Sequence, residues 1–440
     1  MGSRWIPRIT SPGNGGGPIP PGGQDHFAPK YLVGNVPAGD SAVGYNTGGF
    51  MYIPDPGDCT GIVLALTLPN GPGDVWIRPG TYTMSPALTR LLVLSTTRVW
   101  GAGEDYTIIV GNATDNCIVE LEGETEIAAL TVRRPATQSA VGDAVINAKG
   151  LQTTNHEVDV DATLANPPLG PGRITAAILY SQGGIPPNLG WNRLTNVEIL
   201  GPVIAPGAGE QNPLLMFAGV RGIFDPLGTI ALTTISTVTI FNGDAGLVSI
   251  GNLAAQQGAS FTCGRLLITQ PRTIGIYADY SPFFTNGGQS IVLMDAGDAS
   301  VQTGIWLRNA FQYEIGSTLV INSGGAGPGF TPGLILDSPA GAPSGLPTRV
   351  NLHDSTFLGW GLEPAVPVVR FGSGAEVIVG AKMVNCNIDS FGVIPPIELG
   401  LGCTNAIVAL NVGANLNGAP PGGVPSVLGL GNELAHNTWA

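Results

Sequence analysis

The sequence of 440 residues predicts an all-β fold in which many short strands are wound into a solenoid. Short, β-branched apolar runs recur along the chain, and each is bounded by Gly, Asn, Asp or Pro, which is typical of strands and not of helices. The 66 Gly and 37 Pro residues suit the many tight turns that such a chain needs. Hydrophobic residues make up 43% of the chain, which argues against the disorder that so much Gly and Pro can indicate.

The expected strands begin at about residue 55. They include residues 91–94, 127–132, 144–146, 174–179, 194–200, 237–240, 266–269, 291–294, 304–307, 319–322 and 376–379. Because their spacing is loose, periodicity alone leaves a β-sandwich open as an alternative. In a solenoid, Asn residues often stack at the bends, and an ordinary turn role is the alternative for each of them. The candidates are Asn196, Asn242, Asn322, Asn385 and Asn387.

Residues 55–111 carry a specific order of segments. Residues 57–66 read GDCTGIVLAL, residues 75–82 read VWIRPGTY, and residues 98–103 read RVWGAG. This order resembles the first coils of the pectate-lyase-like right-handed parallel β-helix superfamily. The resemblance implies a right-handed single-stranded parallel β-helix. It implies no activity, because that superfamily includes polysaccharide lyases and hydrolases as well as non-enzymatic phage tail, fibre and spike proteins.

The chain is expected to divide into three parts. Residues 1–45 form a Pro/Gly-rich arm and a cap, residues 46–412 the β-helix, and residues 413–440 a cap or tail at the other end. The first thirty residues have a composition that cannot bury a core. An ordered arm of this kind needs a partner surface, so the sequence predicts attachment to other proteins through residues 1–30.

Charge and cysteine content disfavour several partners. The net charge is −13 and the few basic residues form no cluster, which disfavours nucleic acid and an anionic membrane surface. No secretory signal and no apolar run long enough to span a bilayer are visible. The five cysteines lack metal or redox spacing and are expected to be free and buried, so no cofactor and no metal are predicted.

Three groups of residues are weak candidates for catalysis. In a strand, Glu157, Asp159 and Asp161 would share one face about 6.6 Å apart, a spacing suited to an inverting glycosidase pair or to Ca²⁺. The commoner interpretation of this alternation is a solvated outer face. Asp295 and Asp298 lie three residues apart and could act as acid and base, although turns commonly use Asp for local hydrogen bonds.

The third group is residues 353–355, which read HDS. Neighbours in a strand point to opposite faces, so a catalytic triad is disfavoured there. The motifs of polygalacturonase-type hydrolases are missing, and Arg272 has no adjoining acidic cluster in the sequence. Trp76 and Trp100 are expected in the core. Three other tryptophans could either stack on sugars or pack in the core or an interface. These are Trp191, Trp306 and Trp360.

Two functional hypotheses follow. The first is a non-enzymatic virion structural or host-recognition protein, such as a phage tail spike, fibre or head-surface spike, assembled in the host cytoplasm. Such a protein is expected to be a homotrimer and to contact host surface polysaccharide. The second is a polysaccharide lyase or hydrolase that acts as a spike depolymerase.

Overall fold

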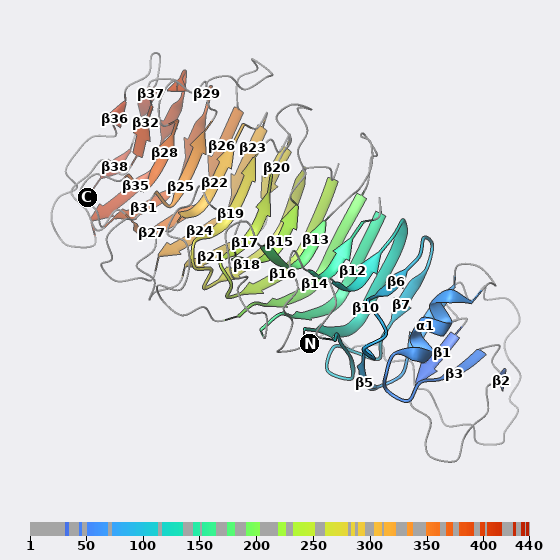
Figure 1. Cartoon of the computed structure of the whole chain (residues 1–440). Helices are drawn as coiled ribbons and strands as arrows, with labels where there is room; N and C mark the ends of the chain where they lie inside the picture. Colours follow the sequence, from blue (N-terminus) through green and yellow to red (C-terminus); the bar gives the residue numbers. More distant parts are fainter. Residues whose placement is uncertain are drawn as a thin grey trace, which may run out of the picture.

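The chain forms a parallel β-helix, seen as an elongated rod with α1 near one end and β38 near the other (Figure 1). The computed structural model describes residues 31–34, 44–45, 51–68, 73–112, 117–134, 144–149, 152–163, 174–180, 191–202, 219–225, 232–250, 260–279, 283–286, 289–294, 303–309, 312–322, 332–337, 349–360, 367–372, 378–390, 397–400, 403–415, 426–427, 433–435 and 437–439. The 1–30 arm and the Asp295 and Asp298 candidates lie outside these residues.

The described strands form two large sheets and one small one. The first sheet contains β1 (Tyr31–Gly34), β2 (Gly44–Tyr45), β3 (Met51–Pro54), β4 (Asp74–Ile77), β5 (Gly80–Thr83), β7 (Arg98–Trp100), β8 (Thr107–Val110), β10 (Glu124–Arg133), β12 (Gln152–Asp161), β14 (Trp191–Leu200), β16 (Leu232–Phe241), β18 (Phe261–Thr269), β20 (Phe283–Asn286), β21 (Ser290–Met294), β23 (Gln312–Gly316), β24 (Thr318–Asn322), β26 (Arg349–His353), β27 (Thr356–Trp360), β30 (Lys382–Val384), β31 (Asn387–Ser390), β34 (Ile407–Ala409), β35 (Val412–Asn415), β37 (Glu433–Ala435) and β38 (Thr438–Trp439). The second contains β6 (Leu91–Val93), β9 (Cys117–Leu121), β11 (Ala144–Ala148), β13 (Ile174–Tyr180), β15 (Gly219–Asp225), β17 (Ala245–Ser249), β19 (Ile274–Asp279), β22 (Thr303–Arg308), β25 (Leu334–Asp337), β28 (Val369–Phe371), β32 (Ile397–Leu399) and β36 (Ser426–Val427). The small sheet pairs β29 (Ile378–Val379) with β33 (Cys403–Thr404).

The first sheet bends along its length and so presents two outer faces. The bend falls inside the long strands, where Ala129, Glu157 and Asn196 take left-handed φ values of 52°, 51° and 51°. Further along the rod the two faces have separate strands, because β18 pairs with β20 before the bend and with β21 after it. We call the part before the bend the first face and the part after it the second face.

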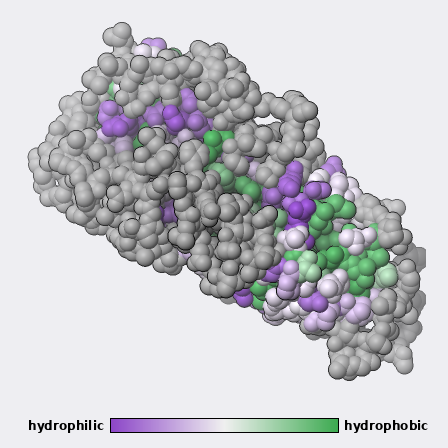
Figure 2. Space-filling view, in the orientation of Figure 1, coloured by the Kyte–Doolittle hydropathy of each residue, from purple (hydrophilic) through white to green (hydrophobic). Residues whose placement is uncertain are grey.

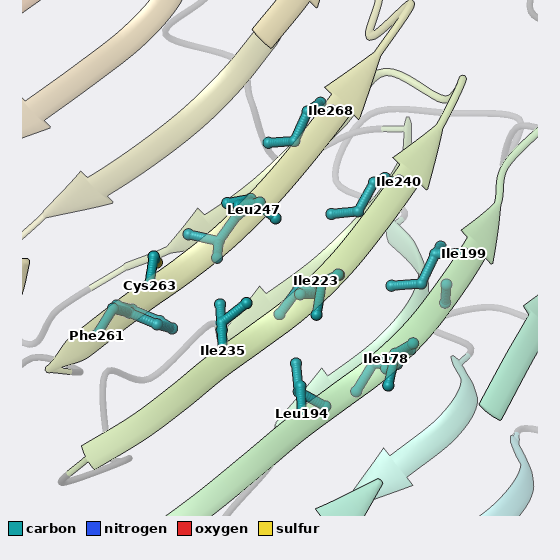
Figure 3. Packing of buried hydrophobic residues seen from close by; sticks show 14 of the residues in the cluster. Ile178, Leu194, Ile199, Ile223, Ile235, Ile240, Leu247, Phe261, Cys263 and Ile268 are labelled. Carbon is teal, nitrogen blue, oxygen red and sulfur yellow. The ribbon is translucent and has the colours of Figure 1, made fainter. Parts of the chain in front are cut away.

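The core is built from ladders of aliphatic side chains that point into the coil (Figure 3). Leu194, Ile235 and Cys263 occupy matched positions of β14, β16 and β18. Ile199, Ile240 and Ile268 form a second ladder on the same strands, and Ile178, Ile223 and Leu247 a third on the second sheet. Each fully buried side chain of this size contributes about 1.5–3 kcal/mol, so the repeated rungs stabilise one another.

Glycine is required where the second sheet comes close to the first. Gly222, Gly246 and Gly275 occupy equivalent positions of β15, β17 and β19. A Cβ atom on Gly246 would lie 2.6 Å from the carbonyl oxygen of Gly275 and 2.7 Å from Cδ1 of Ile268. A side chain at this position would therefore push the two sheets apart.

The rod begins with parallel strands and one helix. Strand β1 pairs in parallel with both β3 and β4, and α1 (Thr60–Thr67) contacts β1, β3, β4 and β6. The buried carboxylate of Asp55 orients the helix, because it accepts hydrogen bonds from the backbone N–H groups of Gly57, Asp58 and Ile62. This helix is not among the elements that the sequence predicted.

Parallel pairing continues to the last described strands. β37 pairs with β34, and β38 pairs with β35. Coil-type pairing therefore extends from Tyr31 to Trp439, beyond the expected limits of the rod at residues 46 and 412. The three-part division of the chain stays a prediction.

Polar ladders at the bend match the expected ones only in part. Asn196, Asn242 and Asn385 occupy left-handed backbone positions, and Nδ2 of Asn385 donates to Oδ1 of Asp354 on the neighbouring rung. The buried ladder is built by other residues, since the backbone N–H of Cys386 donates to Asn411 Oδ1 at 2.9 Å and that of Asn411 donates to Asn437 Oδ1 at 3.0 Å. Asn387 lies in β31, and the side chain of Asn322 lies outside the described residues.

Candidate functional site

A polar pocket of about 520 Å³ lies on the first face, over five consecutive rungs. Its lining consists of Thr96, Arg98, Glu124, Thr125, Glu126, Thr154, Asn192, Arg193 and Thr234. Figure 2 shows hydrophilic and apolar residues side by side over the half of the rod nearer α1.

Strand register brings the pocket residues together from distant parts of the sequence. Arg98 pairs with Glu126, Glu126 with Thr154, and Thr154 with Arg193, which in turn pairs with Thr234. Neighbouring rungs are about 4.8 Å apart, so these side chains form a single row along the rod axis. The inward neighbours Val99, Ile127 and Asn155 are buried, which fixes the row on the outer side.

The carboxylates of the pocket lie on β10, between the rungs of β7 and β12. Glu124 and Glu126 lie two residues apart on β10 and share its outer side, with Glu124 exposed and the side chain of Glu126 26% exposed. Nε of Arg98 lies 3.7 Å from Oε2 of Glu126. Burial nevertheless raises the pKa of Glu126 against the attraction of Arg98 and His156.

Asn192 and Thr125 lie beneath this row, on the inner side of β14 and β10, because their neighbours Arg193 and Glu126 point outward. Asn192 is only 2% exposed, and its Oδ1 accepts hydrogen bonds from the backbone N–H and the hydroxyl of Thr153 at 3.1 and 2.8 Å. These bonds fix the amide so that Nδ2 is the remaining donor, and Nδ2 is buried without a hydrogen-bond partner. The hydroxyl of Thr125 is also buried and unpaired. Both atoms lie inside the coil, as Thr153 does, so they belong to a polar layer of the core and not to the surface of the pocket.

Trp76 and Trp100 lie on the same outer side, next to the row. Their rings stack with centroids 6.2 Å apart and an interplanar angle of 15°. Both are half-buried, so the prediction that they belong to the core is wrong. The strands alternate, and Val75, Ile77 and Val99 are the residues that point inward. The two indoles form an apolar surface of the kind that sugar rings stack upon.

The three carboxylates predicted to share a face on β12 do not all do so. Glu157 occupies the left-handed bend and is 48% exposed, 3.6 Å from Nε2 of His156. The expected alignment of Glu157 with Asp159 and Asp161 is therefore wrong, because the bend turns the chain between them. Asp159 and Asp161 do share the second face, because they alternate with the buried Val158, Val160 and Ala162.

Asp161 is engaged in structural bonds. Nε of Arg133 lies 2.7 Å from its Oδ2, and Thr163 donates two hydrogen bonds to Oδ1. Burial of Asp161 opposes ionisation, but the hydrogen bonds from Thr163 and Arg133 together outweigh it and lower the pKa of this carboxyl.

Residues 353–355 do not form a triad. Nδ1 of His353 lies 2.9 Å from Oδ2 of Asp354, but Ser355 is buried and its hydroxyl donates to the backbone oxygen of His353. Asp354 takes a left-handed φ of 49° at the bend, which separates it from Ser355. The structure arranges no triad here, but the cause is the bend at Asp354 and not the alternation within a strand on which the sequence-based argument rested.

Two other residues considered in the sequence analysis, Trp306 and Arg272, form contacts that stabilise the fold. Trp306 is 9% exposed on the outer side of the second sheet, where its indole donates to Asp337 and Arg308 lies 5.6 Å above its ring. Arg272 forms a buried ion pair with Asp244 at 3.0 Å. The side chains of Trp191 and Trp360 lie outside the described residues.

All five cysteines are free and buried, as expected. Within the described residues, no group of three or more His, Cys, Asp or Glu side chains is arranged to hold a metal ion. The described part of the chain also contains no helix with the length and apolar character needed to cross a bilayer.

No family model and no curated protein matches the chain. Among solved structures, the catalytic unit of the GH87 α-1,3-glucanase from Streptomyces thermodiastaticus strain HF3-3 is similar at 15% identity and a TM-score of 0.42, over 86% of this chain and 66% of that one. The A-module of Azotobacter vinelandii mannuronan C-5 epimerase AlgE6 gives 11% identity and a TM-score of 0.33, over 84% and 87%. ORF18 of Geobacillus virus E2 gives 11% identity and a TM-score of 0.28, over 86% and 58%. The assignment as a parallel β-helix protein rests on the chain's own strand pairing.

Proposed function

We propose that the chain is a non-enzymatic virion structural or host-recognition protein whose β-helix rod binds polysaccharide in the polar pocket. The observation that carries the proposal is the outward row of the pocket, where two arginines, two glutamates and the hydroxyls of Thr154 and Thr234 lie on neighbouring rungs. Sugar hydroxyls both donate and accept hydrogen bonds, so they suit a pocket in which donors and acceptors lie side by side. The stacked Trp76 and Trp100 extend this surface with an apolar platform.

A rod of this kind suits exposure on a particle. Every rung pairs with its neighbours, and coil-type pairing reaches both ends of the described chain. No disulfide is needed for this pairing, because all five thiols are free. In the proposal, residues 1–30 attach the rod to other virion proteins after assembly in the host cytoplasm, and the position corresponds to a tail spike, fibre or head-surface spike.

The homotrimer remains part of the proposal. Leu267, Ile291 and Leu319 point outward in one row of the second face and are half-buried. Leu410 and Val412 are 54% and 51% exposed near the far end of the rod. Packing around a three-fold axis would cover such apolar residues. Sedimentation equilibrium tests this, since a mass of one 45.0 kDa chain would contradict the trimer.

Binding to an array of bacterial surface polysaccharides tests the proposed function. The expected result is retention of at least one glycan by the full chain, with much weaker retention by Trp100→Ala. Arg265→Ala is a matched control, because Arg265 is exposed on β18 and does not line the pocket. The proposal would be contradicted if the chain binds no glycan, or if Trp100→Ala binds as tightly as the wild type.

A second candidate function is hydrolysis of the bound polysaccharide. Glu124 and Glu126 lie about 6.7 Å apart along β10, within the separation of roughly 6.5–9.5 Å found in inverting glycosidases. Burial raises the pKa of Glu126, as a general acid requires. Release of reducing ends by the wild type, and its loss in Glu126→Gln, would favour this enzyme. Binding without release would favour pure recognition.

A further inference from the structure

A group of polar side chains lies inside the coil, beneath the first face. Matched inward positions of β10, β12, β14 and β16 are occupied by Thr125, Thr153, Asn192 and Thr233, none of which is more than 4% exposed. Asn155 follows two residues after Thr153 on β12 and is also fully buried. It interrupts an aliphatic row, because its neighbours on the adjoining rungs are Ile127 and Leu194. We call these five polar residues the inner polar layer.

Most hydrogen-bonding atoms of the inner polar layer have no partner among the described residues. Oδ1 of Asn192 is satisfied, because Thr153 donates two hydrogen bonds to it. Five other atoms are buried and unpaired, namely Nδ2 of Asn192, both amide atoms of Asn155 and the hydroxyls of Thr125 and Thr233. A buried polar atom without a partner bears the full penalty of its lost hydration, so native proteins contain few of them. Five in one layer therefore indicate a ligand inside the coil.

The chemistry of the layer selects that ligand. Asn155 and Asn192 offer amide donors, Asn155 also offers an acceptor, and each threonine hydroxyl can do both. The five side chains carry no charge, so an ion would lack a counter-charge and would be costly to bury among them. Water donates and accepts hydrogen bonds, and it is stable in a protein interior when it has two to four polar partners.

Side-chain size leaves room for water. The row that contains Thr233 continues on β18 with Phe261, which is 1% exposed. A coil that encloses a phenyl ring at this position has much smaller threonines at the same position of β10, β12 and β16. Asn155 is likewise smaller than Ile127 and Leu194 on either side of it. The volume that these side chains leave adjoins their own polar atoms, as a buried water requires.

We propose that ordered water molecules occupy the inner polar layer and bridge its side chains from rung to rung. One water links Nδ2 of Asn192 to the hydroxyl of Thr233, and another links the amide of Asn155 to the hydroxyl of Thr125. In each case the two residues lie on adjoining rungs, about 4.8 Å apart. The inference concerns the interior of the rod and does not depend on the proposed function.

Thr233→Val is the first test, because it removes the hydroxyl and keeps the shape of the side chain. Loss of a hydroxyl that binds water is expected to leave the guanidinium unfolding midpoint at or below that of the wild type. Loss of a hydroxyl without any partner would raise the midpoint. Thr262→Val is the matched control, because Thr262 occupies an exposed outward position of β18. Its midpoint should stay near that of the wild type.

Magnetic relaxation dispersion of water oxygen-17 is the second test, because it counts the long-lived waters inside the full chain. The wild type is expected to contain such waters. Asn155→Leu, which completes the aliphatic row, is expected to lose one or more of them, whereas Thr262→Val should lose none. If Asn155→Leu does not fold, the same loss is expected in Thr233→Val. A raised midpoint for Thr233→Val, or an unchanged number of internal waters in the inward variant, would overturn the proposal.

Discussion

Oδ1 of Asn192 accepts hydrogen bonds from both the backbone N–H and the hydroxyl of Thr153, and this directs its Nδ2 donor away from Thr153. Both residues point into the coil, so Asn192→Ala should destabilise the chain, because it leaves the buried N–H and hydroxyl of Thr153 without this acceptor. We expect a loss of about 2 kcal/mol in the free energy of unfolding. Guanidinium unfolding measures this loss.

Asn351→Ala is the matched control for that variant. Asn351 lies on β26, on the outer side of the first face, and is half-buried. Its loss should therefore leave the unfolding midpoint near that of the wild type. Equal midpoints for the two variants would contradict a structural role for Asn192.

The thiols should be inert in the folded protein. Burial raises the pKa of Cys263 and Cys403 to about 12 and that of Cys386 to about 11. A thiol reacts as its thiolate, so an aromatic disulfide reagent at pH 8 should label the native chain very slowly. After denaturation all five thiols should react. Rapid labelling of the native chain would show that the coils open locally.

Asn411→Ala should destabilise the far half of the rod. Asn411 is fully buried, accepts from the backbone N–H of Cys386 and donates to the backbone oxygen of Met383 at 3.1 Å. Its loss leaves two buried backbone groups without these partners, which should cost about 3 kcal/mol. Guanidinium unfolding measures this, with Asn351→Ala as a half-buried control. Equal midpoints for the two variants would contradict a structural role for the ladder.

Asp161→Asn should show a pH-dependent loss of stability. Because the pKa of Asp161 is lowered from 3.8 in the folded chain, the carboxylate stabilises the fold above that value, and the contribution is lost as the pH falls through the lowered pKa. At pH 7 we expect a loss of about 1 kcal/mol or less, since Arg133 is 41% exposed. Thermal unfolding at pH 7 and pH 2.5 checks this. A stability difference between wild type and variant that is larger at pH 2.5 than at pH 7 would contradict a lowered pKa of Asp161.

The architecture was accessible from the sequence because its signals are local. The apolar runs and the order of segments in residues 55–111 correctly predicted a parallel β-helix. The bends were harder to locate, because they fall on residues as different as Ala129 and Glu157. The alternation of apolar and polar residues also continues through them. The preference of asparagine for bends correctly predicted that Asn196 and Asn385 lie at bends. It did not predict which residues form the buried hydrogen-bonded ladder.

The candidate site was largely hidden from sequence reasoning. Glu126 and Arg193 are 67 positions apart, and only the register of three strands brings them to one pocket. The strand lengths and intervening segments vary, so this register does not follow from periodicity. One signal was visible, since Val75 and Ile77 flank Trp76 and alternation alone places that indole on the outside.

The pocket draws its side chains from five consecutive rungs, and this gives the rod an unusual route for change. Inserting one complete rung between β12 and β14 would preserve the aliphatic ladders and the strand pairing, yet it would move Arg193 about 4.8 Å farther from Glu126. Duplication or loss of a single coil would thus alter the length of the proposed binding site without disturbing the fold. The specificity of such a site can change through the number of rungs as well as through the exchange of residues.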